Sequence, residues 1–167
     1  MTISRERETP GVRPTLQSLT DPVHFFALGF GTGLVPFAPG TFGSLVGLAF
    51  ALALAPFGLW WNVFAIVVAV AAGVWICGES ARRLGVHDHP AIVWDEVAGM
   101  MITMLAAPDA WWGAPLAFVL FRVFDIAKPW PIREVDHGMP GGAGIMLDDV
   151  LAGIFAALVL LVVDYAT

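Results

Sequence analysis

Charged residues are scarce in this 167-residue chain, because Asp, Glu, Lys and Arg together make up only 13% of it. That fraction is about half of the globular average. None of the four occurs between Pro22 and Gly78, whereas 58% of all residues are hydrophobic. So little charge argues against a water-soluble fold and is typical of an integral membrane protein.

Cysteine and net positive charge are also lacking. The single cysteine, Cys77, excludes an internal disulfide and a paired-cysteine metal site. It lies in an apolar run, where we expect a small buried hydrophobic residue. The 8 basic residues are outnumbered by 14 acidic ones, which gives a formal net charge of −6. Because nucleic acid is a polyanion, this balance excludes nucleic-acid binding.

The first 21 residues differ in character from the rest of the chain. They carry mixed charges and two prolines but few apolar side chains, so they cannot contribute much to a core. We expect residues 1–21 to form a flexible N-terminal tail and residues 22–167 to form a single helical membrane domain. The apolar patch after the tail is interrupted by glycines and has no small-residue cleavage pattern, which argues against a removable signal peptide.

Three apolar runs predict membrane-crossing helices in an all-α fold. Residues 59–77 are free of charge over a length that, at about 1.5 Å per residue, nearly crosses the ~30 Å hydrocarbon layer. Residues 42–55 form a shorter run that ends at Pro56, and we expect a second span there. Residues 147–163 predict the last span. No internal repeat is evident.

The segment 97–121 allows two interpretations. It is either one span with Asp109 near its centre, or two short helices joined at Pro108 and Asp109. The hairpin keeps Arg122, Lys128 and Arg133 on the same side as the basic residues of the tail and of residues 82–83. This distribution follows the preference of basic residues for the cytoplasmic side, so we favour the hairpin.

Outside the tail, charge is concentrated in three short segments next to apolar runs: WDEVAG, FRVFDIAKPWP and GGAGIMLDDVLAG. The carboxylates of these segments are Asp95, Glu96, Asp125, Asp148 and Asp149. Single carboxylates at a helix start can cap free N–H groups and complement the helix dipole, at ~0.3 to 1 kcal/mol each. Alternatively, the five together supply oxygen ligands for Mg²⁺, which prefers carboxylates and relieves their mutual repulsion.

The cations of the second segment, Arg122 and Lys128, flank Asp125 at three-residue spacing. Two intrahelical ion pairs, worth ~0.2 to 0.5 kcal/mol each, are one explanation. A bound phosphate is the other and favoured one, because weak pairs hardly justify cations at a lipid boundary.

Two glycine-rich segments precede apolar helices. Residues 31–44, GTGLVPFAPGTFGS, combine rigid prolines with the hydroxyls of Thr32, Thr41 and Ser44, and Thr41 is placed to cap the following helix. Such a segment can bind phosphate or serve as a plain connector. Residues 141–146, GGAGIM, are expected to be either a mobile loop or a turn.

Four ordered segments, GTGLVPFAPGTFGS, DEVAG, FRVFDIAKPWPI and GGAGIMLDDVLAG, resemble the signature segments of the phosphatidylglycerophosphatase A family. The resemblance extends from about Gly29 to Gly153. It implies a helical, multi-pass protein of the bacterial inner membrane whose polar active site faces the cytoplasm. It also implies Mg²⁺-dependent dephosphorylation of phosphatidylglycerophosphate, a phospholipid of the bilayer, to phosphatidylglycerol.

The residue pattern and the resemblance agree on the candidate roles. The five carboxylates would be catalytic and hold Mg²⁺, which activates either water or an attacking aspartate. The candidates for phosphate or glycerol contacts are Thr32, Thr41, Ser44, Arg122 and Lys128. The alternative function from another class is a small ion or metal transporter, because carboxylates within a membrane often mark ion paths.

Overall fold

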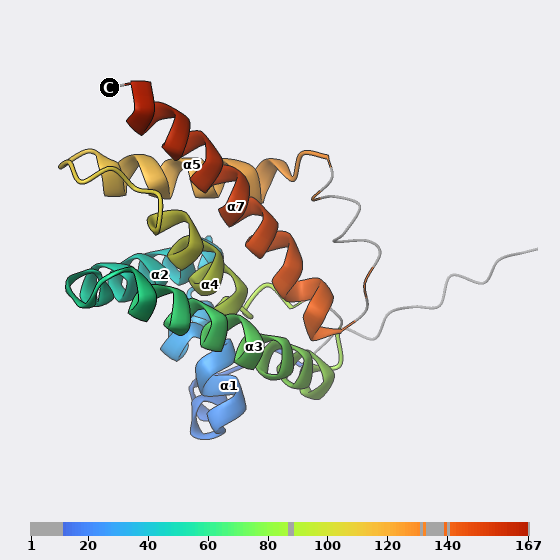
Figure 1. Ribbon diagram of the computed structural model, residues 1–167. Helices are drawn as coiled ribbons and strands as arrows, with labels where there is room; N and C mark the ends of the chain where they lie inside the picture. The colour runs from blue at the N-terminus through green and yellow to red at the C-terminus, as the bar shows by residue number, and fades with distance from the viewer. Residues whose placement is uncertain (1–11, 87–88, 131, 133–138, 140, 167) are drawn as a thin grey trace, which may run out of the picture.

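Helices make up the regular structure throughout the computed structural model, which describes residues 12–86, 89–130, 132, 139 and 141–166 (Figure 1). The helices in chain order are η1 (Leu16–Thr20), α1 (Pro22–Ala27), η2 (Gly29–Leu34), α2 (Pro39–Leu54), η3 (Ala55–Phe57), α3 (Leu59–Leu84), α4 (Trp94–Met104), α5 (Gly113–Ala127) and α7 (Gly142–Ala166). The described residues contain no strand. The predicted all-α fold is therefore confirmed.

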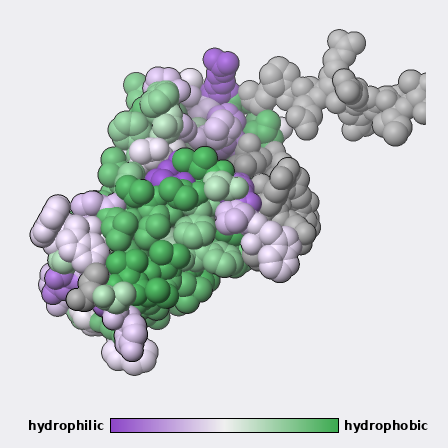
Figure 2. Space-filling model, turned by 90° about the horizontal axis from the view of Figure 1, so that it is seen from above, coloured by the Kyte–Doolittle hydropathy of each residue, from purple (hydrophilic) through white to green (hydrophobic). Residues whose placement is uncertain are grey.

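Three helical segments are long and apolar enough to cross a membrane: Pro39–Phe57, Leu59–Leu84 and Gly142–Ala166. They correspond to the three predicted spans, and each is longer than its apolar run alone. Less than half of each span is buried against the rest of the protein, so most of its apolar surface faces outward. Figure 2 shows a broad hydrophobic surface of this kind, in green.

The segment between the second and third spans is a helical hairpin. α4 has 11 residues and α5 has 15, which at about 1.5 Å per residue gives lengths of roughly 16 Å and 22 Å, short of a ~30 Å hydrocarbon layer. Residues 105–112 connect the two helices, and Asp109 is exposed in this connection. The hairpin interpretation is therefore correct. The alternative, one span with Asp109 near its centre, is wrong.

α4 lies at the centre of the bundle, in contact with α2, α3, α5 and α7 (Figure 1). Eight of its 11 residues are buried. Glycines allow its neighbours to come close: a Cβ added to Gly153 of α7 would lie 2.5 Å from the Gly99 carbonyl of α4. In a membrane the hydrophobic effect does not drive helices together, so helix contacts depend on close packing of small residues. Because α4 is packed on several sides, the side chains of its first turn are held in a fixed position within the bundle.

The start of α2 and the ends of α3 and α5 gather at the same end of the bundle as the starts of α4 and α7. Gly40 of α2 lies against Glu96 and Arg122, and Lys128 after α5 lies 2.7 Å from Asp148 of α7. The opposite end holds the α2–α3 and α4–α5 connections. Arg133 and residues 1–11 of the tail lie outside the described residues, so only part of the basic distribution is placed.

The described part of the tail is attached to this same end. The Val12 N–H donates to the Leu84 carbonyl at 3.0 Å, and Asp21 caps α1 by accepting from the Val23 N–H at 2.9 Å. Arg83 of α3 forms an ion pair with Asp21. Desolvation raises the pKa of Asp21, but the Val23 hydrogen bond and the charge of Arg83 outweigh it and hold that pKa below its ordinary value.

Candidate active site

A cavity of about 240 Å³ lies at the charged end of the bundle, among the starts of α2, α4 and α7 and the end of α5. It is lined by Ala38, Pro39, Gly40, Pro90, Ile92, Asp95, Glu96, Arg122, Asp125, Lys128, Asp148 and Asp149. All five carboxylates and both cations predicted from the sequence are therefore brought to one place. Their charges, from three separate helices, meet where helix N-termini add partial positive charge.

Asp95 and Glu96 occupy the second and third positions of α4, in its first turn. Their carboxylates are held by a helix of which eight of 11 residues are buried, and Asp95 is only 8% exposed. Gly40 of α2 packs directly on Glu96, because a Cβ at Gly40 would overlap the Glu96 Oε1 atom. The close approach of α2 thus closes one wall of the cavity around this carboxylate.

Asp148 and Asp149 belong to the second turn of α7, because α7 begins at Gly142. The expectation that residues 141–146 form a mobile loop or a turn is therefore wrong from Gly142 onward, since these residues are helical. The capping explanation is wrong for the same reason: both aspartates lie beyond the free N–H groups of the helix start. They nevertheless are 7% and 3% exposed, so burial of two adjacent acids calls for another cause.

Oxygen atoms of Asp95, Glu96 and Asp149 all lie within 4.8 Å of one another. Two like charges about 4 Å apart repel by roughly 4 kcal/mol at an effective dielectric constant of ~20, so such a group is costly without a cation. The Glu96 Oε2 and Asp149 Oδ1 atoms are buried and accept no hydrogen bond. Oxygens on opposite sides of an octahedral Mg²⁺ are about 4.2 Å apart, so this donor set fits Mg²⁺.

The other two carboxylates of the cavity hold its cations. Arg122 forms an ion pair with Asp125 within α5, as the three-residue spacing predicts. Lys128 is the C-cap of α5 and reaches across to Asp148 of α7, with Nζ 2.7 Å from Oδ2. The explanation by two intrahelical ion pairs therefore holds for Arg122 only, because Lys128 pairs with another helix. Both cations line the cavity, where they can meet an anionic ligand.

The three predicted hydroxyl ligands lie outside the cavity lining. Ser44 is fully buried, donates to the Gly40 carbonyl at 2.8 Å and accepts from Arg122 Nη1 at 3.5 Å. Thr32 donates to the Gly29 carbonyl at 2.8 Å. The expectation that Thr41 caps α2 is wrong, because α2 begins at Pro39 with Ala38 as its N-cap. Of the three hydroxyls, only that of Ser44 contacts a charged residue that lines the cavity.

Sequence reasoning missed the segment that precedes α4. Pro90 and Ile92 line the cavity, and the Val93 N–H donates to the Ala27 carbonyl at 2.9 Å. The polar stretch around His89 is the signal that marks this segment, although its composition alone indicates no role. Another missed feature is a buried contact between His24 Nδ1 and Ser80 Oγ at 2.8 Å, which joins α1 to α3.

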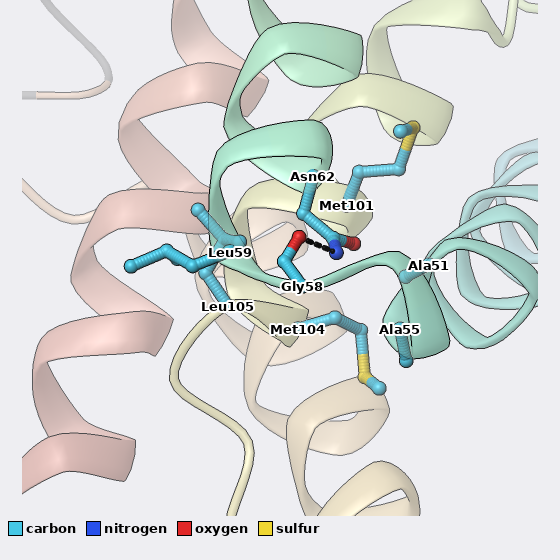
Figure 3. Close-up of a pocket in the computed structure, with 8 residues that line it drawn as sticks. All are labelled: Ala51, Ala55, Gly58, Leu59, Asn62, Met101, Met104 and Leu105. Atoms are coloured by element: carbon cyan, nitrogen blue, oxygen red, sulfur yellow. Dashed lines mark hydrogen bonds between the residues drawn. The ribbon is translucent and has the colours of Figure 1, made fainter.

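A cavity of about 200 Å³ at the opposite end contains no ionisable side chain (Figure 3). Asn62 is its polar residue, and the Asn62 side-chain amide donates to the Gly58 carbonyl at 2.8 Å and to the Leu54 carbonyl at 3.1 Å. These bonds satisfy carbonyls at the α2–α3 connection. Of these two cavities, only the one at the charged end is lined by ionisable side chains of the described residues.

Known proteins are similar in sequence to this chain over most of its length. A sequence model of the phosphatidylglycerophosphatase A family matches residues 25–164. A relative from Escherichia coli (strain K12), named phosphatidylglycerophosphatase A, is 44% identical over 145 residues, which cover 85% of this chain and 83% of the relative. A Haemophilus influenzae protein of the same name is 45% identical over 151 residues, with coverages of 89% and 92%.

A third relative, from Bacteroides thetaiotaomicron, is 41% identical over 142 residues, which cover 80% of this chain and 88% of the relative. It is provisionally named a phosphatidylinositol-3-phosphatase. No solved structure matches the chain. The family model alone covers more than half of the chain, and it agrees with the four motifs that carried the resemblance. The chain therefore belongs to the phosphatidylglycerophosphatase A family and is a phosphatase.

Proposed function

We propose that this chain removes the terminal phosphate of phosphatidylglycerophosphate to give phosphatidylglycerol and inorganic phosphate, with Mg²⁺ as its cofactor. The observation that carries this proposal is the meeting of five carboxylates, Arg122 and Lys128 in one cavity at one end of the membrane spans. The names of the Escherichia coli and Haemophilus influenzae relatives support the substrate.

The carboxylates divide into two groups by their partners. Asp95, Glu96 and Asp149 would hold Mg²⁺, because their oxygens are mutually close and buried oxygens of Glu96 and Asp149 accept no hydrogen bond. When bound, the ion would polarise the phosphate and lower the pKa of a bound water. Asp125 and Asp148 instead hold the two cations in place. This division sharpens the prediction that all five are metal ligands.

Arg122 and Lys128 would bind the phosphate to be removed. The Arg122 guanidinium offers a planar set of donors, and its Nε is buried and makes no hydrogen bond to the protein. Lys128, which also lines the cavity, supplies a point charge. Together they can stabilise the negative charge that spreads over the phosphate oxygens during displacement. The attacking oxygen, from a water or an aspartate, would bond to phosphorus while the bond to the glycerol oxygen breaks and that oxygen takes up a proton. If an aspartate attacks, water would then hydrolyse the aspartyl-phosphate to release inorganic phosphate.

The position of the cavity suits a lipid substrate. The acyl chains of phosphatidylglycerophosphate stay in the bilayer, so its phosphate must be reached at headgroup depth. The cavity lies at the starts of the first and third apolar spans, which contribute Pro39, Gly40, Asp148 and Asp149 to its lining. Basic residues such as Arg82 and Arg83 share this end, which favours the cytoplasmic face of the bacterial inner membrane.

Phosphate release from phosphatidylglycerophosphate in mixed detergent micelles tests the activity. We expect release with Mg²⁺, its loss with a chelator, and its return when Mg²⁺ is restored. Phosphatidylinositol 3-phosphate serves as the competing substrate and should be hydrolysed more slowly. Release that persists through chelation would contradict the metal, and preference for the inositol lipid would contradict the substrate.

Cysteine labelling tests the orientation, because the only native cysteine, Cys77, is buried. Arg82 and Trp111 are exposed at opposite ends of the bundle, so each can be replaced by Cys. In spheroplasts a membrane-impermeant maleimide should label Trp111→Cys at once and Arg82→Cys only after permeabilisation. The reverse pattern would place the cavity on the outer face of the membrane.

The transporter alternative is not favoured by the structure. An ion path through the protein needs polar or ionisable groups along its length. The cavity at the opposite end is lined by no ionisable side chain, and glycine contacts between α4 and α7 close the centre of the bundle. The ionisable groups of the acidic cavity therefore have no counterpart in the cavity at the opposite end of the described structure.

A further inference from the structure

A second cavity lies beside the acidic one at the same end of the protein. Its volume is about 460 Å³, and it shares two wall residues, Pro39 and Pro90, with the acidic cavity. Its remaining walls come from residues 33–36, residues 89–91 and the N-terminal segment at Arg13 and Pro14. The two cavities are therefore neighbours across a pair of prolines.

The charges of the two neighbouring cavities differ in sign. Five carboxylates line the acidic cavity, whereas none of the described residues that line the second cavity is acidic. The ionisable residues of its wall are Arg13 and His89. The Arg13 guanidinium is exposed to solvent, always charged, and carries five donors that fit phosphate oxygens. The second cavity is therefore suited to an anion.

The wall of the second cavity is held in shape before any ligand binds. The Val35 N–H donates to the Thr32 carbonyl at 3.1 Å, and the Ala91 N–H donates to His89 Nδ1 at 3.1 Å. Gly33 packs on the backbone of Ala91 so closely that an added Cβ would overlap the Ala91 carbonyl. A preformed wall lowers the ordering cost of binding.

The proposed substrate carries two phosphates, which are separated by one glycerol. Its terminal monoester is the group to be removed, and its phosphodiester joins the headgroup to the diacylglycerol. When the monoester lies in the acidic cavity, the phosphodiester must lie one glycerol length away, and the carboxylates of the acidic cavity would repel it. The neighbouring cavity offers a cation, Arg13, directly beside the acidic cavity.

We propose that this second cavity is a subsite for the phosphodiester of the substrate, with Arg13 as its anion-binding side chain. The inference rests on the proposed function. The phosphodiester is not changed by the reaction, so its contact with Arg13 is equally strong in the ground state and the transition state. Such a contact lowers KM and leaves kcat unchanged. The subsite would favour lipids with two phosphates over lipids with one.

Kinetics of Arg13→Ala on phosphatidylglycerophosphate in micelles of fixed composition test the subsite. We expect KM to rise about tenfold, which corresponds to about 1.4 kcal/mol, with kcat within about twofold of wild type. Arg13→Lys keeps the charge but not the planar donor set, so its KM should rise by about threefold at most. The difference between wild type and Arg13→Ala should shrink in high salt, because the guanidinium is exposed.

Arg82→Ala is the matched control, because Arg82 lies at the same end with 73% of its side chain exposed but lines neither cavity. Its KM should stay that of wild type. An unchanged KM in Arg13→Ala, an equal rise in Arg82→Ala, or a loss that falls on kcat would overturn the subsite. Wild-type protein that releases no phosphate from phosphatidylglycerophosphate would instead refute the proposed function, so the two failures are distinguishable.

Discussion

The two ends of this helical bundle contain cavities of similar size but opposite chemistry. The cavity at one end measures about 240 Å³ and is lined by five carboxylates and two cations. The cavity at the other end measures about 200 Å³, and its polar side chain is Asn62, which donates to the Gly58 carbonyl (Figure 3) and to the Leu54 carbonyl. The hydrogen bonds of Asn62 stabilise the fold, so the cavity at the Asn62 end needs no functional explanation. The acidic cavity at the other end does need one.

The cost of the charged end shows why it requires a functional explanation. Buried like charges destabilise a fold, and a chain with so few charged residues could have placed them in water. Instead, α4 and α7 bury Asp95, Asp148 and Asp149 to below a tenth of their surface. Natural sequences break local rules of stability mainly at functional sites. The contrast between the ends therefore locates the chemistry without reference to any relative.

Replacing one metal-binding carboxylate should produce the largest effect. Asp149→Asn keeps the size of the side chain but removes a charge from the group of Asp95, Glu96 and Asp149. We expect kcat to fall by roughly a thousandfold, since electrostatic stabilisation of the transition state usually contributes more to catalysis than any other effect. Phosphate release from purified protein measures this, with size-exclusion chromatography in detergent to show that the variant is folded.

The same replacement at the other end is the control. Asp109→Asn changes an exposed carboxylate in the α4–α5 connection. The cavity at that end is lined by no acidic residue of the described structure. It should keep wild-type activity. Near-normal turnover by Asp149→Asn would remove Asp149 from the catalytic group, and inactivity of Asp109→Asn would show that the two ends do not differ in the way we describe.

The two ends can also be compared by replacing one glycine at each end with alanine, which adds a single carbon atom. A Cβ at Gly40 would overlap Glu96 Oε1 and lie 3.2 Å from Arg122 Nη1, whereas a Cβ at Gly58 would meet nothing within 4 Å. Gly40→Ala should therefore lower kcat on the order of 100-fold, as displacement of reacting groups by about 1 Å can do. Gly58→Ala should keep kcat but lower the melting temperature, because Gly58 has a φ of 86°.

Most of the fold and the membership of the acidic cavity could be predicted from the sequence. The apolar runs mark the spans, and the acids at 95–96, 125 and 148–149 stand out because charge beside lipid needs a reason. The true start of α7 could not be predicted, because five residues from Gly142 to Met146 look like a glycine-rich loop. They are helical because tertiary contacts with α3 favour glycine there, which overrides its low intrinsic propensity for helix.

The partners of the cations also escaped prediction. Three-residue spacing suggests that Lys128 pairs with Asp125, but α5 ends before Lys128, whose φ of 39° turns the chain toward Asp148 of α7. Similarly, Ser44 is a plausible ligand by composition, yet its helix directs it into the core against Arg122. Pairings between distant segments depend on helix packing, which spacing along one segment does not encode.

Ser44→Ala should produce a smaller effect than either change within the cavity. Ser44 touches Arg122 but does not line the cavity, so it acts as a positioning residue for that guanidinium. Loss of such support typically costs about 10-fold to 100-fold, and the 3.5 Å contact here favours the lower end. We expect kcat to fall by about tenfold. Since Thr103 is an equally buried hydroxyl between α4 and α7, Thr103→Ala should change stability but not kcat.

The smallest effect on activity should come from the polar residue of the uncharged end. Asn62→Ala removes two hydrogen bonds to the carbonyls of Leu54 and Gly58, each worth about 1 kcal/mol. Thermal unfolding in detergent should show this loss as a lower melting temperature, while kcat and KM stay at wild-type values. A variant that unfolds earlier yet turns over normally separates the two ends by function. A fall in kcat at a temperature where Asn62→Ala remains folded would mean that the α2–α3 connection controls the distant carboxylates, and the contrast between the ends would then fail.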